Sequence, residues 1–202
     1  MELSWKFGNS GWAIKTGVGI YLPDGCTTGA NGLGCEANPY TTYQPELIIS
    51  YLRDGWNLSA ALYEEFNTEN RDTHYTTGNI FHVDLTATKT IGKWTFGPVA
   101  YYVAQVTDDS CPASCTALGN STLAHTGRFE TWAVGGLVGY DFGPASLSVW
   151  ATQEVHASAH NDAAANLGFD PSVTAKGATV FATLSYRLWA PEAPVAPAMY
   201  HK

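Results

Sequence analysis

The sequence predicts an all-β protein, an antiparallel up-and-down transmembrane β-barrel. Three features predict it: strands that alternate apolar and polar residues, short turns that alternate with long polar loops, and few charged residues. Strands in soluble proteins usually run to about 5–6 residues, whereas a strand tilted across a bilayer needs about 9–11. The predicted strands are of the longer kind. A soluble lipocalin-like barrel is the alternative, but its apolar face would point inward and it would show no aromatic belt.

The clearest strands lie between residues 78 and 107. From Phe81 the odd positions are apolar, and the even positions from His82 to Thr88 can form hydrogen bonds. This is the period-2 pattern of a half-buried strand. Gly92-Lys93 then predicts a two-residue hairpin turn that places Ile91 opposite Trp94.

The same pattern, followed along the chain, predicts about nine strands. They are residues 2–8, 12–20, 43–51, 56–65, 81–91, 94–106, 132–142, 145–152 and 178–189. Short turns near residues 10, 54, 92 and 143 alternate with polar loops at 23–39, 67–77, 108–127 and 156–175, as periplasmic turns and outer loops do in outer-membrane barrels.

Residues that face each other across the short turns are mostly apolar. The turns place Phe7 opposite Trp12, Tyr51 opposite Leu58, Ile91 opposite Trp94 and Phe142 opposite Ala145, with Arg53 opposite Trp56 as the exception. Aromatic residues therefore gather at this end as an interfacial girdle, with Tyr186 near the end of the last strand.

Composition excludes several other classes of protein. Charged residues make up 14% of the chain, against about 25% in soluble domains. The sequence contains no run of about 18 apolar residues, so it predicts no transmembrane helix. The net charge of -8 argues against a nucleic-acid partner.

An odd number of strands disagrees with the even number in bacterial single-chain barrels. We therefore expect residues 1–189 to form an N-terminally incomplete barrel that one or three strands precede. The chain also begins without the basic and apolar regions of a secretory signal peptide. Residues 190–202 are expected to form a Pro-rich tail in the periplasm.

Four cysteines form two close pairs inside the predicted loops, Cys26 with Cys35 and Cys111 with Cys115. Close spacing within loops predicts local disulfides in an oxidising compartment. The alternative is one four-thiolate metal site, which the distance between the two loops disfavours.

The polar face of the strands is expected to line a channel. The candidate lining residues are Lys15, Glu46, Tyr63, Glu65, His82, Asp84, Tyr101 and Arg187. Glu46, Glu65 and Asp84 come from adjacent strands and could form an acidic constriction that favours cations or the polar groups of aromatic ligands. Alternatively, these carboxylates pair with Lys15 and Arg187 or are simply solvated.

Other polar clusters give weaker hypotheses. His82 and Asp84, with Ser50 or Ser59, could form a hydrolase triad, but no nucleophile motif accompanies them. His156 and His160 are expected in or beside a loop as a solvated pair, and Asn67, Glu69 and Asp72 could hold calcium only loosely. We therefore predict no catalytic residue, metal or cofactor.

Several segments resemble one known family. They are GVGIYLPDG (17–25), YQPELIISYLRDGWNLS (43–59), residues 63–109 and WAVGGLVGYDFGPASLSVWATQEV (132–155). Together they are similar to the outer-membrane family named for the meta-pathway of phenol degradation. The resemblance implies a twelve-strand barrel in the bacterial outer membrane, in contact with lipid, that takes up small hydrophobic or aromatic compounds passively. A barrel-embedded enzyme acting on lipid, a non-conducting structural barrel and a homo-oligomer stay open as alternatives.

Overall fold

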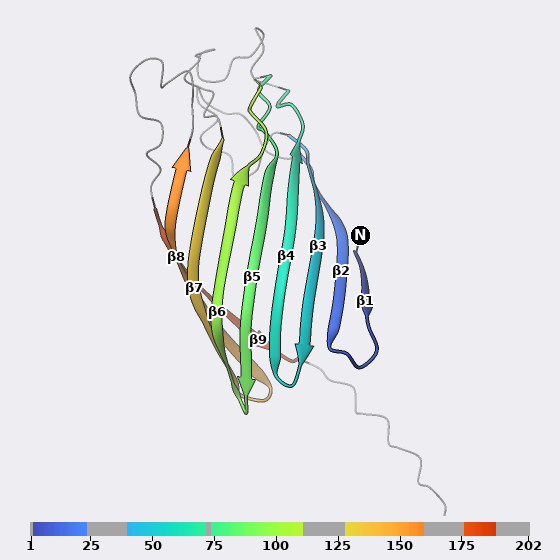
Figure 1. The fold of residues 1–202 in the computed structure, drawn as a ribbon, viewed down its shortest axis with the longest axis vertical. Coiled ribbons are helices and arrows are strands. Elements are labelled where there is room, and N and C mark those ends of the chain that lie inside the picture. The colour runs from blue at the N-terminus through green and yellow to red at the C-terminus, as the bar shows by residue number, and fades with distance from the viewer. Residues whose placement is uncertain (1, 24–39, 72–73, 111–127, 160–175, 189–202) are drawn as a thin grey trace, which may run out of the picture.

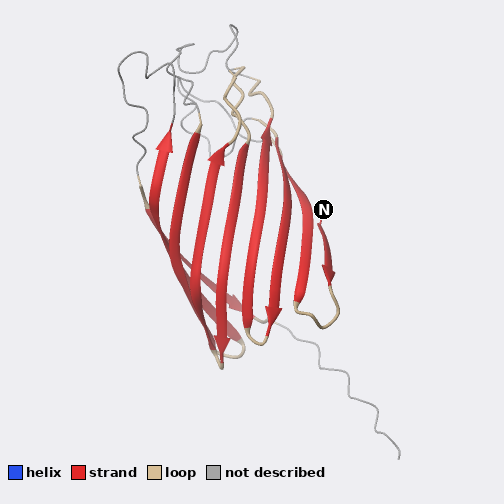
Figure 2. Cartoon of the chain, viewed as in Figure 1, coloured by secondary structure: helices blue, strands red, loops and turns tan. Residues whose placement is uncertain are grey.

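The computed structural model describes residues 2–23, 40–71, 74–110, 128–159 and 176–188. Nine strands form one antiparallel sheet in which each strand pairs with the next along the chain (Figures 1 and 2). They are β1 (Glu2–Lys6), β2 (Trp12–Tyr21), β3 (Thr42–Arg53), β4 (Trp56–Asn67), β5 (Ile80–Ile91), β6 (Trp94–Gln105), β7 (Phe129–Asp141), β8 (Ala145–Ala159) and β9 (Ala178–Tyr186). The predicted all-β meander of nine strands is confirmed.

The sheet is curved but open. Figure 1 shows β9 passing behind the strands at the front of the view. Within the described residues β1 and β9 are the two edges of the sheet, and they are not paired with each other. The prediction of a closed barrel is therefore not met by these nine strands alone. Both edge strands run in the same direction, because eight antiparallel steps separate them, so a direct pairing of β1 with β9 would be parallel and would not give an all-antiparallel barrel.

The short turns lie at one end of the sheet and have the predicted register. Asp54 and Gly55 both have positive φ (53° and 77°), as a type I′ hairpin turn requires. Gly92 is also in the left-handed region, with φ 61°, and Ile91 faces Trp94. Each of the other predicted pairings is likewise present: Tyr51 with Leu58, Arg53 with Trp56, Phe7 with Trp12 and Phe142 with Ala145.

Six of the nine strands are longer than a tilted strand needs to be to cross a bilayer. β3, β4, β5 and β6 have 12 residues each, β7 has 13 and β8 has 15. These lengths exceed the about 9–11 residues of a tilted transmembrane strand. No helix in the described ranges is both long and apolar enough to span a membrane.

Several strand ends differ from the prediction, and two of these differences involve candidate residues. β9 ends at Tyr186 instead of continuing to residue 189, although the Arg187 amide still donates to Pro144 O at 2.8 Å. β8 continues to Ala159, so His156 lies in a strand and not in a loop. The pairing of β7 with β8 shifts between Trp132 and Ala133 because Val155 is an extra residue on β8.

The sheet is a single layer with two different faces. The cross-strand row Trp12, Tyr51, Leu58 and Ala87 lies on one face, which we call the apolar face. The row Ser50, Ser59 and Thr86 lies on the opposite face, the polar face. Among the described residues the only buried hydrophobic side chains are Ala61, Ala104 and Ala133. The sheet therefore has no hydrophobic core of its own.

Candidate functional site

The polar face carries a network of charges on β1, β2 and β3. Lys15 Nζ lies 2.9 Å from Glu2 Oε1 and 3.1 Å from Glu46 Oε1. Lys15 and Glu46 are both sheltered, with side chains 34% and 16% exposed. Glu46 is thus paired with Lys15. This pairing is the alternative to an acidic constriction that the sequence analysis named.

A second polar chain continues across β2, β3, β4 and β5. Tyr21 Oη donates to Gln44 Oε1 at 2.9 Å, and Gln44 Nε2 donates to Glu65 Oε1 at 3.2 Å. Glu65 Oε1 also lies 3.3 Å from His82 Nε2. Each of these side chains thus contacts a neighbour from an adjacent strand, which fixes the polar face laterally.

The three candidate acidic residues occupy successive levels of the polar face. Glu46, Tyr63 and His82 form one row through their pairing across β3, β4 and β5. Glu65 lies two residues along β4 from Tyr63, toward the long loops, and Asp84 lies two residues along β5 from His82, toward the short turns. Of these three carboxylates, Asp84 is the one that forms no hydrogen bond or ion pair with the described residues.

Tyr101 on β6 reaches across β7 to β8. Its hydroxyl donates to Glu154 Oε1 at 3.1 Å, and between them lies Ala133, which is fully buried. The other oxygen, Glu154 Oε2, accepts from the Gly177 amide at 2.6 Å. A small residue at position 133 allows this long-range contact.

Aromatic and aliphatic side chains occupy the polar face near β9. Leu137 pairs with Trp150, and Trp150 pairs with Phe181. The Trp150 and Phe181 rings stack with centroids 4.6 Å apart and an interplanar angle of 27°. The prediction omitted these residues from the channel lining, although Trp150 alternates with Ser148 and Thr152 and so must share their face.

The remaining candidate lining residue, Arg187, follows the end of β9. Its alternation with Ser185 and Thr183 places it on the polar side, but it forms no ion pair with the part of the chain that the structure describes. The predicted alternative in which Arg187 neutralises the carboxylates has no contact to support it.

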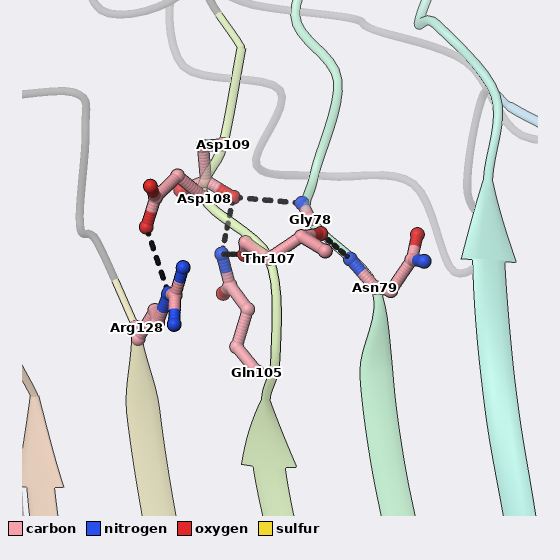
Figure 3. Close-up of polar contacts among 7 residues, drawn as sticks. All are labelled: Gly78, Asn79, Gln105, Thr107, Asp108, Asp109 and Arg128. Atoms are coloured by element: carbon pink, nitrogen blue, oxygen red, sulfur yellow. Dashed lines mark hydrogen bonds and ion pairs between the residues drawn. The ribbon is translucent and has the colours of Figure 1, made fainter.

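A hydrogen-bonded cluster joins the loop before β5 to the end of β6 (Figure 3). Asp109 Oδ1 accepts from the Gly78 amide at 2.9 Å and from Gln105 Nε2 at 2.8 Å, and the Tyr75 hydroxyl donates to Asp109 Oδ2 at 2.6 Å. Gln105 is only 4% exposed. The carboxylate of Asp109 therefore anchors this loop at the long-loop end of the sheet.

Tyr40 lies at the same end, just before β3. Burial raises the pKa of its phenol, and the carboxylates of Glu65 and Asp109 raise it further, whereas a hydrogen bond with Thr77 lowers it. Tyr40 therefore stays neutral to a higher pH than a free tyrosine.

The structure separates the groups of the weaker hypotheses. Ser59 Oγ is 2.8 Å from Ser50 Oγ and donates to Asn57 at 2.6 Å, whereas His82 contacts Glu65, so no hydrogen bond joins a serine to His82 in the described residues. His156 Nε2 lies 3.1 Å from Glu130 on the opposite, apolar face.

The candidate calcium ligands are also engaged elsewhere or lie beyond the described ranges. Asn67 accepts from Thr42 at 2.7 Å, and Glu69 Oε1 lies 2.7 Å from His74 Nδ1. No group of three metal-ligating side chains occurs within the described ranges. Asp72, His160 and all four cysteines, Cys26, Cys35, Cys111 and Cys115, lie outside the described residues.

Aromatic residues line both ends of the apolar face. At the short-turn end Trp12 contacts Tyr51, with ring centroids 5.4 Å apart, and Trp94 contacts Tyr140 at 4.7 Å. Toward the long loops a second belt contains Tyr43, Phe66, Tyr102 and Trp132, with the Tyr102 and Trp132 centroids 4.4 Å apart. The first belt was predicted, whereas the second was not.

Comparison with known proteins identifies one family. Residues 2–183 match the family model described as "Putative MetA-pathway of phenol degradation". No curated protein and no solved structure matches the chain. Because the match covers nearly the whole sequence, the chain belongs to this phenol-degradation family.

Proposed function

We propose that the protein is a β-barrel channel of the bacterial outer membrane through which small hydrophobic or aromatic compounds pass passively. The observation that carries this proposal is the single-layer sheet with large apolar side chains exposed on one face and polar ones on the other. In water such a face would drive aggregation, whereas lipid covers it at no cost. The family match supports the class of solute.

The spacing of the two aromatic belts agrees with the thickness of a membrane. Trp56 begins β4 at the short turn and belongs to the first belt, and it lies ten residues from Phe66 of the second belt, on the same apolar face. At about 3.3 Å per residue and a strand tilt of about 40°, they are separated by about 25 Å along the membrane normal. An outward-facing apolar band of about 25 Å is typical of outer-membrane barrels.

We propose that further strands close the barrel. Since β1 and β9 run in the same direction, an odd number of additional strands between them gives an all-antiparallel barrel with an even total. Three additional strands would give the twelve that the resemblance implies. The polar face then lines the interior. The channel-lining residues would include Lys15, Glu46, Tyr63, Glu65, His82, Asp84 and Tyr101.

Conductance across a planar bilayer tests the proposal. The protein that contains all strands of the barrel, refolded into lipid, is expected to conduct ions and to admit phenol into liposomes faster than it enters protein-free liposomes. Thr86 and Ala87 are neighbours on opposite faces of β5 and provide a matched pair. Thr86→Trp should reduce conductance because it narrows the interior, whereas Ala87→Trp should leave it unchanged.

The same preparation separates the alternatives. Folded protein that neither conducts nor admits phenol would refute the channel and favour a structural barrel. Hydrolysis of the liposome phospholipids, lost in His82→Ala, would instead favour an enzyme acting on lipid. Conductance reduced equally by Thr86→Trp and Ala87→Trp would contradict the assignment of the two faces.

A further inference from the structure

The polar face contains a groove of about 230 Å³ between β5 and β8. Its wall includes Asp84, Val99, Tyr101, Leu137, Trp150 and Thr152. Ligand sites for drug-sized molecules are about 300–1,000 Å³, whereas an apolar cavity of about 150 Å³ can hold benzene. The groove therefore has the size of a molecule with one aromatic ring.

Three adjacent rows of paired residues build the groove. The row toward the long loops contains Asp84, Tyr101 and Ala133, and the row toward the short turns contains Leu137 and Trp150. The groove is thus acidic and hydroxylated on one side, and aromatic and aliphatic on the other.

The middle row is hollow because Gly135 lies between Val99 and Thr152. Only glycine fits at position 135, since a Cβ there would lie 1.8 Å from Ala151 O on β8. The row therefore has no side chain at this point. Rows on one face are about 6.6 Å apart, so the polar and aromatic rows are separated by about 13 Å. A single ring fits between them.

Two polar groups of the groove have no hydrogen-bond partner among the residues that the structure describes. Asp84 forms no hydrogen bond or ion pair with the described residues. Thr152 is only 5% exposed, and its Oγ1 has no hydrogen-bond partner within the described part of the chain. The Thr152 hydroxyl oxygen is itself inaccessible from the groove in this structure. Rotation about χ1 would exchange the hydroxyl and methyl positions of Thr152 and turn the hydroxyl toward the groove. Because buried polar groups are nearly always hydrogen-bonded, a ligand there would supply the missing partner.

We propose that this groove binds a monocyclic aromatic compound that carries a hydroxyl group. The ring packs against Trp150 and Leu137, and the ligand hydroxyl donates to the carboxylate of Asp84. Thr152 can supply a second hydrogen bond. This inference rests on the proposed function, because it treats the polar face as the channel interior, and it adds the site at which the solute pauses.

Equilibrium binding of radiolabelled phenol to proteoliposomes tests the site, with empty liposomes subtracted for partitioning into lipid. The expected result is saturable binding of one phenol per protein and weaker binding of toluene, which lacks the hydroxyl. Asp84→Asn should weaken phenol binding roughly tenfold, since hydrogen bonds to charged groups are the stronger ones, and should leave toluene unaffected. Trp150→Leu should weaken both ligands, whereas the matched change Trp94→Leu on the apolar face should weaken neither.

Binding and flux together distinguish this inference from the proposed function. Phenol flux without saturable binding would overturn the site and leave the channel intact. Saturable binding without flux would support the site and refute the channel. Binding unchanged in both Asp84→Asn and Trp150→Leu, or toluene bound as tightly as phenol, would also overturn the inference. Thr152→Val, which keeps the shape of the side chain, should reduce phenol binding alone.

Discussion

A positive charge in the middle of the apolar face should destabilise the protein strongly in lipid. Leu85 on β5 is 44% exposed and faces Ala60 on β4. Ala60 is four residues from Trp56 of one aromatic belt and six from Phe66 of the other. Leu85 therefore lies near the centre of the apolar band, and Leu85→Arg places a guanidinium there.

The position of Leu85 sets the magnitude. Four residues at about 3.3 Å each, on a strand tilted by about 40°, correspond to a depth of about 10 Å in a band of about 25 Å. Arginine near the midplane of a barrel costs about 2–4 kcal/mol, whereas near the interface it costs about 0–1 kcal/mol. We therefore expect the folding equilibrium constant to fall roughly 30-fold to 700-fold, since each 1.4 kcal/mol is a factor of about ten.

Denaturant unfolding in lipid vesicles measures this effect. Ile91→Arg at the short-turn end is the interfacial control, and Thr86→Arg is the control on the opposite face next to Leu85. Both should cost less than about 1 kcal/mol, because water solvates the charge at either position. A loss for Leu85→Arg no larger than that for Ile91→Arg would refute the placement of this face in lipid. A loss of stability above about 1 kcal/mol for Thr86→Arg would refute the assignment of the two faces.

Three further changes test separate parts of the structure. Gly78→Ala should release the loop anchored on Asp109, because a Cβ there would lie 2.0 Å from Thr107 O; limited proteolysis should cut this loop faster, and unchanged cleavage would contradict the close contact. Lys15→Met should raise cation selectivity, because it leaves Glu46 without its cation; the reversal potential in a salt gradient measures this, and an unchanged potential would place Lys15 outside the pore. Burial raises the pKa of Tyr40 in the folded protein, so the neutral phenol favours the folded state fully below about pH 10, and this contribution to stability is lost as the pH rises through the folded-state pKa. Tyr40→Phe has no phenol to ionise and should therefore unfold at a higher pH than the wild type. An identical alkaline midpoint of unfolding would refute this role.

Strands and short-turn pairings could be predicted because they depend on local sequence. Alternation determines which residues share a face, and a turn such as Asp54-Gly55 determines the register of the two strands that it joins. The pairing of Glu46 with Tyr63 follows from that turn alone. The face and level of a residue within each hairpin could therefore be predicted from the sequence.

Pairings across the long loops could not be predicted, because a long loop imposes no register. The contact between Glu65 and His82 depends on the alignment of β4 with β5, which the loop between residues 67 and 80 does not determine. The contact between Tyr101 and Glu154 likewise depends on the alignment of β6 with β7, which the loop between residues 105 and 129 does not determine. The bulge at Val155 lies beyond Glu154 and reverses the face of every later residue on β8, including His156.

The polar face divides into two halves with different chemistry, and this division would give the proposed channel selectivity. Glu2, Lys15 and Glu46 form a charged network on β1 to β3, whereas Trp150 and Phe181 present aromatic surface on β8 and β9. A hydrated ion is stabilised only by the first half, and an unsubstituted hydrocarbon only by the second. Between the two halves, on β5 and β6, Asp84 and Tyr101 face each other in one row, so a molecule with an apolar ring and one polar group can contact these polar groups while its ring lies toward Trp150. Such molecules are therefore expected to have the lowest barrier to passage through the proposed channel.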